Sequence, residues 1–307
     1  MTPERRSART RRGYTLVELM IAMTMLGIMG TLVAQIMMSQ QRFFQRLSEQ
    51  TNVRRELRNT LGTLPTELRG LSTVGGDLTS FGATSLTFRS TIGSSIVCDK
   101  TSSTSIDVPP IDAARTSLSN WVTRPSVGDM VYILHHDNGG VAGDFWSQHS
   151  ITAVTEGAGF CSSPQASVYT HAQDDAGKLR YRFTVTPALP APVTTGSAVR
   201  FTRSTRYELA AQSSGRWYLQ RQEWQGNQWT TPVVLSGPYL PPAANGTGGM
   251  SFTYFDSLNV AVAPAGDSRR VARIDVALRA LAQAGSDRNS TTPNDSVFLS
   301  IAVRNRR

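Results

Sequence analysis

One long apolar run dominates the hydrophobic pattern of the chain. It covers residues 14–38, and Glu18 is its only charged residue. At about 1.5 Å of rise per residue, a helix of this length crosses a hydrocarbon core of about 30 Å. The run is longer than the apolar region of a typical signal peptide, and the residues after it, 39–43, are polar and bulky where a secretory cleavage site needs small ones. The pattern therefore predicts a transmembrane helix.

Helical periodicity continues beyond the apolar run. Residues 41–64 contain no proline, and their apolar side chains recur near three- and four-residue spacing, at Phe43, Phe44, Leu47, Val53, Leu57, Leu61 and Leu64. This stripe needs a surface to pack on. Pro65 is expected to end the helix or to start a new segment, so that the predicted helix covers residues 14–64.

From about Thr79 the pattern changes to short, alternating runs rich in Thr, Ser and Val, separated by Gly and Pro. Such runs are typical of antiparallel β structure. The clearest predicted strands cover residues 129–135, 179–186, 199–210, 216–224, 250–256, 271–281 and 297–303. In the last two, apolar and polar positions alternate, so that one face of each is buried and can receive the helix stripe.

The predicted fold class is α+β, with a long N-terminal helix packed on a C-terminal antiparallel β-sheet domain that covers residues 65–307. The region from about Ile92 to Val193 is rich in Ser, Pro and Gly, which indicates an insertion into this domain. Gly226-Asn227, between two short polar–aromatic pairs, is a two-residue hairpin signal.

Composition narrows the class of protein. Of 307 residues, 39% are hydrophobic and 17% are charged, which excludes both a disordered chain and a multi-pass transporter. The formal net charge is +9, but Arg5, Arg6, Arg9, Arg11 and Arg12, against Glu4, contribute four of these charges. The remainder is modest for a chain of this size, so bulk charge gives little support to nucleic-acid binding.

Charge also predicts the orientation of the apolar segment. Five arginines precede it, and five follow it at Arg42, Arg46, Arg54, Arg55 and Arg58. The leading arginines lie closer to the membrane, so the positive-inside rule favours a cytoplasmic N-terminus. A single ionised carboxylate inside a membrane helix costs about 2.5–3.5 kcal/mol on insertion scales, and Glu18 therefore needs a reason to be there.

The residues around Glu18 supply a reason for a carboxylate at this position in the membrane helix. The segment Arg11-Arg12-Gly13-Tyr14-Thr15-Leu16-Val17-Glu18-Leu19 resembles the class III leader of type IV pilins and type II secretion pseudopilins. The resemblance implies that prepilin peptidase cuts between Gly13 and Tyr14, that Tyr14 is then N-methylated, and that residues 1–13 are a removable leader. It also implies that the Glu18 carboxylate pairs with the terminal amine of an adjacent subunit. Tyr14 departs from the phenylalanine that is commonest there, but it keeps an aromatic ring.

A weaker resemblance bears on the subtype. Residues 206–209, 217–221 and 297–306 look like the tail of PilW-type minor pilins and of the related J-type pseudopilin. Without its leader the chain would still be large for a major pilin. The expected function is therefore that of a minor pilin that takes part in initiation or tip assembly of a type IV pilus. The alternatives are a J-type minor pseudopilin and a filament-borne module that binds DNA or a surface.

The resemblance also implies partners and a location. Expected partners are other minor pilins or pseudopilins, the major pilin, prepilin peptidase and the inner-membrane assembly platform. The chain would lie in the inner membrane with its N-terminus cytoplasmic and its C-terminal domain periplasmic, and then in a pilus or pseudopilus. No cofactor is expected.

Cys98 and Cys161 are the two cysteines, and their spacing matches no redox or zinc motif. The residues alone leave either a single disulfide or two free thiols. If the leader places the domain in the periplasm, where thiols oxidise, a Cys98–Cys161 disulfide is expected.

Catalytic and nucleic-acid sites have less support. His135, His136, Asp137, Asp144 and His149 form the densest polar cluster, but adjacent histidines on a strand point to opposite faces, and Asp137 begins ordinary turn chemistry. No nucleophile elbow, phosphate loop or dinucleotide motif occurs, so an enzyme is not expected. A DNA-binding face stays an open alternative, with arginines and aromatic residues on neighbouring strands at Arg200, Arg203, Arg206, Arg216, Arg221, Tyr207, Trp217 and Trp224.

Overall fold

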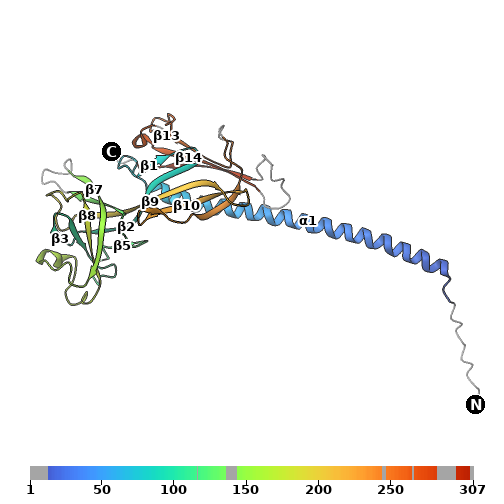
Figure 1. Cartoon of the computed structure of the whole chain (residues 1–307), viewed down its shortest axis with the longest axis horizontal. Coiled ribbons are helices and arrows are strands. Elements are labelled where there is room, and N and C mark those ends of the chain that lie inside the picture. Colours follow the sequence, from blue (N-terminus) through green and yellow to red (C-terminus); the bar gives the residue numbers. More distant parts are fainter. Residues whose placement is uncertain are drawn as a thin grey trace, which may run out of the picture.

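A single helix, α1 (Leu16–Arg69), leads into the globular part of the chain in this computed structural model, which describes residues 13–115, 117–135, 144–243, 247–264, 266–281 and 295–304. The first half of α1 stands clear of everything else, and its last turns pack on a β-sheet (Figure 1). Its apolar window is long enough to cross a membrane, and none of that window is buried in the structure. The helix and the large antiparallel sheet confirm the predicted α+β fold.

The C-terminal end of α1 differs from the prediction. The helix does not stop at Leu64 but runs through Pro65 to Arg69. Proline removes one backbone donor from the helix, yet Pro65 is buried, and Leu64 and Leu68 beside it are 1% and 0% exposed. Burial of one such side chain contributes about 1.5–3 kcal/mol, which offsets the lost hydrogen bond.

The described residues also form fifteen strands and two short 3₁₀ helices. These elements are β1 (Leu78–Phe81), β2 (Ser85–Ile96), β3 (Asp99–Ser102), β4 (Ser105–Val108), β5 (Asn120–Trp121), β6 (Met130–His135), β7 (Phe145–Gly157), η2 (Pro164–Val168), β8 (Arg180–Thr186), β9 (Ala198–Ala211), β10 (Trp217–Gln225), β11 (Gln228–Trp229), β12 (Val233–Tyr239), β13 (Met250–Phe255), η3 (Ser268–Arg270), β14 (Arg273–Ala280) and β15 (Asp295–Ala302). All seven predicted strands are present, each within two residues of its predicted bounds. β1 to β5, β7, β11 and β12 were not among them.

The first lobe, here called the helix–sheet lobe, contains α1 and the sheet order β13-β14-β12-β10-β9, with β15 beside β14 and with β2 and β1 beyond β9. Its core joins the helix to the alternating faces of β14 and β15, as the sequence predicted. The core residues include Val53, Leu57, Leu64, Leu68, Tyr207, Leu219, Ile274, Val276, Leu278 and Ile301.

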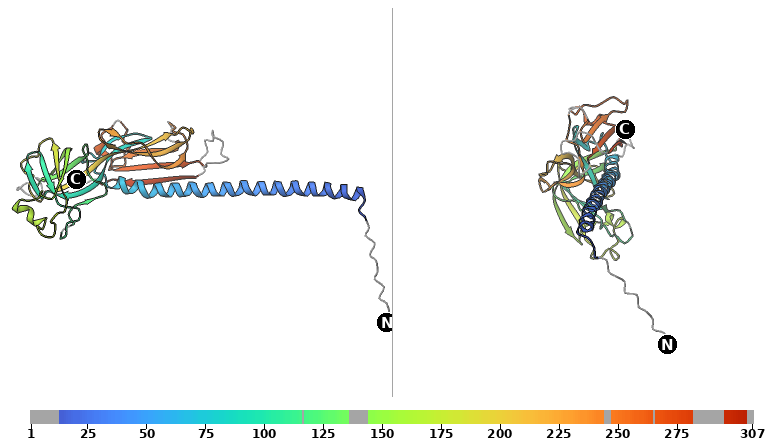
Figure 2. Two further views of the ribbon diagram at one scale, coloured as in Figure 1. Left: turned by 60° about the horizontal axis from the view of Figure 1, so that its bottom comes forward. Right: turned by 90° about the vertical axis from the view of Figure 1, so that its right-hand side faces the viewer.

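The second lobe, here called the distal barrel, lies at the end of the molecule opposite the N-terminus (Figures 1 and 2). Its strands follow the order β9-β6-β7-β8-β4-β3. β2 and β3 follow each other along the chain, separated only by Val97 and Cys98. Because β2 pairs with β9, the first strand of this order, the last strand is connected back to the first and the strands form a closed barrel. A separate core fills this lobe, and its members fall between Ile92 and Phe201. The predicted insertion near Ile92 to Val193 thus corresponds to a lobe with its own core.

The two lobes share one ladder. β2 and β9 pair from Ser85 opposite Glu208 to Ile96 opposite Ala198, with a register shift between Thr91 and Gly93. At Gly93 the ring of Trp121 comes so close that an added Cβ would lie 2.4 Å from its Cδ1 atom. Because glycine has no Cβ, the Trp121 ring can pack against the backbone where the two lobes join.

Candidate functional site

The N-terminal end of α1 holds the predicted processing and assembly residues. Gly13, Tyr14 and Thr15 have no regular secondary structure, and Tyr14 is 90% exposed. The Gly13–Tyr14 peptide bond therefore lies outside the hydrogen bonds of the helix, in a chain segment that an enzyme can reach.

Glu18 takes part in a capping box at the start of α1. The Glu18 amide donates to the Thr15 hydroxyl at 3.3 Å, and the Thr15 amide donates to the Glu18 carboxylate at 3.2 Å. This reciprocal arrangement satisfies two backbone donors that a helix N-terminus otherwise leaves free. The same carboxylate that the leader resemblance assigns to assembly thus also fixes where the helix begins.

The apolar stripe of α1 is only partly used within the chain. Val53 and Leu57 are buried against the sheet, whereas Phe43, Phe44 and Leu47 are 59%, 66% and 43% exposed. The stripe therefore continues, uncovered, from the globular part toward the apolar segment. Exposed apolar surface on this scale is typical of a contact with another protein or with a membrane.

One comparison with known families bears on this end of the chain. The family model of the prokaryotic N-terminal methylation motif matches residues 8–34. The chain carries the prepilin leader of the type IV pilin and pseudopilin superfamily. The match covers the leader and the first turns of α1 and does not extend to the strands of either lobe. No curated protein and no solved structure matches the chain.

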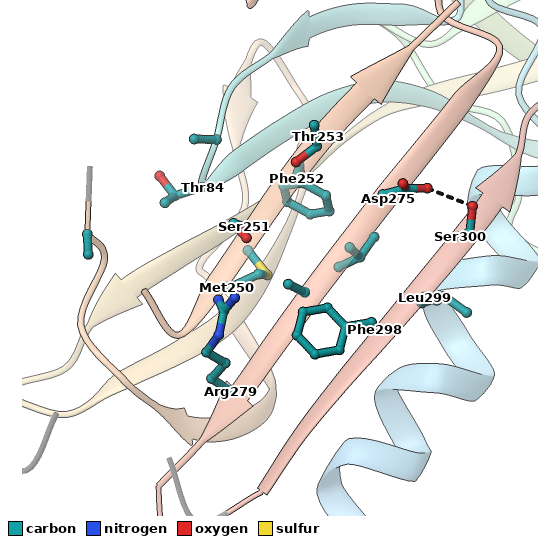
Figure 3. A pocket seen from close by; sticks show the side chains of 14 residues that line it. Thr84, Met250, Ser251, Phe252, Thr253, Asp275, Arg279, Phe298, Leu299 and Ser300 are labelled. Atoms are coloured by element: carbon teal, nitrogen blue, oxygen red, sulfur yellow. Dashed lines mark hydrogen bonds between the residues drawn. The ribbon is translucent and has the colours of Figure 1, made fainter. Parts of the chain in front are cut away.

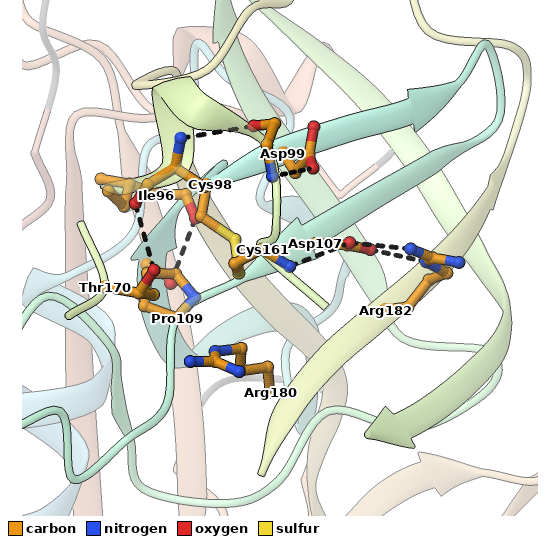
Figure 4. Close-up of a disulfide and its surroundings, with 12 residues drawn as sticks. Ile96, Cys98, Asp99, Asp107, Pro109, Cys161, Thr170, Arg180 and Arg182 are labelled. Atoms are coloured by element: carbon orange, nitrogen blue, oxygen red, sulfur yellow. Dashed lines mark hydrogen bonds and ion pairs between the residues drawn. A yellow bond between two sulfur atoms is a disulfide. The ribbon is translucent and has the colours of Figure 1, made fainter. Parts of the chain in front are cut away.

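The structure of this pilin-like chain pairs Cys98 with Cys161 across a sequence separation of 63 residues (Figure 4). Both cysteines are buried and pack with Ala166 and Tyr169 in a small cluster on the distal barrel. The Cys161 amide donates to the Asp107 carboxylate at 3.4 Å. The disulfide therefore attaches the segment after β7 to the strands β3 and β4.

The histidine cluster does not assemble a metal site within the described part of the chain. His135 is fully buried and stacks on Phe145 with ring centroids 4.3 Å apart. The ring nitrogens of His149 contact the Pro187 carbonyl at 2.7 Å and the Ser147 hydroxyl at 2.6 Å. Burial, with a smaller contribution from His149, lowers the pKa of His135, which favours its neutral form. His136 and Asp137 lie outside the described residues.

The arginines proposed for a DNA-binding face are engaged inside the chain, and two of them, Arg203 and Arg221, meet at the carboxylate of Glu223. Arg203 is 1% exposed and lies between Asp129 and Glu223, at 2.8 Å and 3.1 Å. Arg200 pairs with the buried Asp77 at 2.9 Å, and Arg206 covers the ring of Trp229. The distal barrel, residues 97–197, contains six Lys or Arg against nine Asp or Glu. Neither the arginine positions nor the barrel charge provides a basic surface for DNA.

Arg203 instead connects the two lobes. It extends from the shared strand β9. Two of its hydrogen bonds, both at 2.8 Å, go to Asp129, which precedes β6 of the barrel. Glu223 belongs to β10 of the helix–sheet lobe. The hydrogen bond with Asp129 raises the pKa of Arg203 above its usual range, although burial opposes this.

Tyr207 has a similar internal role. Its hydroxyl donates to Glu67 of α1 at 2.8 Å, so it ties the helix to the sheet. Burial, together with the negative charge of Glu67, raises the pKa of Tyr207. This residue is therefore part of the helix–sheet contact and is not available to stack on a base.

An open groove of about 550 Å³ crosses the outer face of β13, β14 and β15 (Figure 3). Phe298 is 70% exposed in it, and the guanidinium of Arg279 lies 5.5 Å from the centre of its ring. Asp275 accepts from Ser300 at 2.6 Å and from Arg273 at 3.0 Å, so its carboxylate is neutralised. The groove therefore offers a mainly apolar surface on the helix–sheet lobe.

Proposed function

We propose that the protein is a minor pilin, a structural subunit that takes part in initiation or tip assembly of a type IV pilus. The observation that carries this proposal is the prepilin leader followed by a helix whose apolar half is not covered by any of the described residues. A membrane supplies that cover before assembly, and the helices of neighbouring subunits supply it afterwards.

The distal barrel supports a position at the tip. It lies at the end opposite the N-terminus, beyond the last turn of α1 (Figure 2). A shaft subunit has neighbours above and below it, so an extra lobe at this end would occupy the space of the next layer. At the tip no next layer exists, and the lobe can point away from the cell.

Processing and topology follow from the same proposal. Prepilin peptidase would cut between Gly13 and Tyr14 on the cytoplasmic side and methylate the new amine. The Glu18 carboxylate would then pair with the amine of an adjacent subunit, since opposite charges attract strongly in a low-dielectric environment. Both lobes would lie in the periplasm, with the assembly platform and the other pilins as partners.

The proposal is tested by cross-linking and pull-down of the full-length chain from its own host. A minor pilin should capture other minor pilins and the major pilin, and deletion of its gene should reduce the number of surface pili. Capture of pseudopilins, with normal pili and a loss of protein secretion, would instead identify a J-type pseudopilin.

A further inference from the structure

The distal barrel contains a cavity that its packing does not explain. The cavity has a volume of about 380 Å³ and lies beside the disulfide, where Phe160, Ser162, Ser167, Thr170 and Arg180 line it. Figure 4 shows Arg180 close to Cys161. Binding sites for small molecules have volumes from about 300 Å³ upward, so the cavity is large enough for one sugar-sized ligand.

Arg180 provides an unbalanced positive charge at this cavity. The residue is only 8% exposed. Its guanidinium donates to two neutral backbone carbonyls, those of Ala158 and Asp175. Its Nε is buried without a hydrogen-bond partner, and among the described residues no carboxylate lies within ion-pair distance of it. A buried charge without a counter-ion is costly and is rarely retained without one.

Three neighbouring carboxylates are engaged with other cations, and a fourth, that of Asp99, accepts from the Ser163 amide at 3.3 Å. Asp107 receives two hydrogen bonds from Arg182, at 2.7 Å and 2.9 Å. Asp175 pairs with Lys178 at 3.2 Å, and Asp174 pairs with Arg115 at 2.6 Å. Each of these three acids thus neutralises a different base, and the guanidinium at the cavity is left for an anion from outside.

We propose that this cavity binds an acidic monosaccharide unit, with Arg180 as the counter-ion of the sugar carboxylate. An arginine fork matches the two oxygens of a carboxylate. Ser167 and Thr170 donate their hydroxyl protons to the carbonyls of Pro164 and Ala166, so their oxygens remain as acceptors for sugar hydroxyls. Ser162 and Phe160 also line the cavity, and the guanidinium of Arg182 lies 4.2 Å from the centre of the Phe160 ring. The disulfide holds this lining in place. The inference goes beyond assembly, because it gives the lobe farthest from the membrane a ligand.

The test uses the full mature chain in detergent micelles and measures binding by calorimetry, with D-glucuronate as the probe. We expect saturable binding of D-glucuronate and a rise in Tm, with little binding of D-glucose, which lacks the carboxylate, or of acetate, which lacks the sugar ring. Arg180→Gln should weaken binding at least about tenfold, since it removes a charge-assisted pair. Arg270→Gln removes the same charge from the helix–sheet lobe, where Arg270 pairs with Asp256 away from the cavity, and should bind like the wild type.

A second variant guards against misfolding of Arg180→Gln. Ala172 is an exposed residue of the cavity lining, so Ala172→Trp should fill the space without removing any hydrogen bond of Arg180. It should fold with an intact disulfide and lose D-glucuronate binding. The proposal is overturned if the wild type does not bind D-glucuronate, if acetate binds equally well, or if a folded Ala172→Trp chain binds unchanged.

Discussion

The proposed cleavage site consists of two adjacent residues, Gly13 and Tyr14, which lie before the first turn of α1. Gly13→Leu should block cleavage because the peptidase would have to accept a bulky side chain, whereas Gly13→Ala should be cut partly. N-terminal sequencing of the membrane-extracted protein checks this, and the wild type should begin at methylated Tyr14. Tyr14→Phe, which keeps the aromatic ring, is the matched control. An intact Met1 terminus in cells with active peptidase would contradict the prediction.

Glu18 caps α1, and substitution can separate this contact from the charge pairing proposed for assembly. Glu18→Gln keeps an oxygen that can accept from the Thr15 amide but removes the charge. We expect normal cleavage, at least equal membrane insertion and a clear fall in incorporation into pili, measured by immunoblot of sheared filaments.

The complementary change is Thr15→Ala, which removes the hydroxyl cap and leaves the Glu18 charge. It should cost about 1 kcal/mol of local helix stability and leave incorporation near wild type. If Thr15→Ala fails to incorporate while Glu18→Gln succeeds, capping rather than charge pairing is the function of Glu18.

Residues differ in how far sequence alone could identify them. The roles of Gly13, Tyr14 and Glu18 were predicted through a resemblance, because their contiguous order of basic, small, aromatic and acidic residues is similar to a prepilin leader. Arg203 and Arg180 were not, since their importance comes from partners that are far away in sequence, such as Asp129, or from the absence of a carboxylate. Arg203 was considered only as a DNA-binding residue. Its burial between two acids shows that the local arginine–aromatic pattern reflected packing.

At the scale of elements, the disulfide is the main covalent constraint on the distal barrel. Closing a loop of 63 residues stabilises the folded chain by about 4 kcal/mol if the unfolded chain behaves as a flexible coil. Cys98→Ser with Cys161→Ser should therefore lower the Tm of the barrel. Peptide mapping by mass spectrometry without reductant should find the linked pair in an oxidising host. Two alkylated thiols in the folded wild-type protein would refute the bond.

Strand β10 carries a pH-sensitive contact through Glu223. Burial alone would raise the pKa of its carboxyl, but hydrogen bonds and charge from Arg221 and Arg203 hold that pKa below its usual value of 4.5. The folded state therefore gains stability from ionised Glu223 above that value and loses it as the pH falls through the lowered pKa.

Glu223→Gln should accordingly lower Tm at pH 7 but make Tm less sensitive to acid between about pH 5 and pH 3. Thermal unfolding at several pH values measures both effects. Glu208→Gln on the adjacent strand β9 is the control, because no ion pair of Glu208 is found among the described residues. Equal acid sensitivity of the wild type and Glu223→Gln would show that the Arg203 contact does not depend on this carboxylate.

Helices and strands were predicted correctly where apolar and polar residues alternate clearly. They were predicted incorrectly where contacts with distant parts of the chain determine the structure. β14 and β15 alternate clearly and were found, whereas β12, which contains Gly237-Pro238, was not predicted. The sheet accepts that pair through a cis peptide bond and a glycine with φ of 134°. The helix end predicted at Pro65 was wrong for a related reason. Burial of the last turn of α1 outweighed the tendency of proline to end a helix.

At the scale of the whole molecule, the sequence indicated an insertion but not its shape. Ser, Pro and Gly enrichment marks loops and turns, and it located the region near Ile92 to Val193. Closure of the barrel depends on β3 returning beside β4 while β2 stays with β9. The β3–β4 pairing is a local hairpin. The β2–β9 pairing joins residues about a hundred positions apart in sequence, and no local pattern specifies it.

The separate cores predict that the distal barrel can be removed. Thr91 and Thr202 face each other across the β2–β9 ladder, and the barrel core lies between Ile92 and Phe201. Replacing residues 92–201 with Asn-Gly should therefore close a two-residue hairpin and leave the helix–sheet core intact. Arg203 loses Asp129 in this variant but keeps Glu223.

This shortened chain should unfold cooperatively, be cleaved after Gly13 and enter pili, because its leader, Glu18 and the exposed stripe of α1 are unchanged. It should no longer bind D-glucuronate. Thermal unfolding by circular dichroism, N-terminal sequencing and immunoblots of sheared pili provide the three measurements, with the full-length chain in parallel. A soluble, cleaved chain that stays out of pili would show that the barrel itself takes part in assembly. Aggregation would show that the shared ladder makes the two lobes one folding unit.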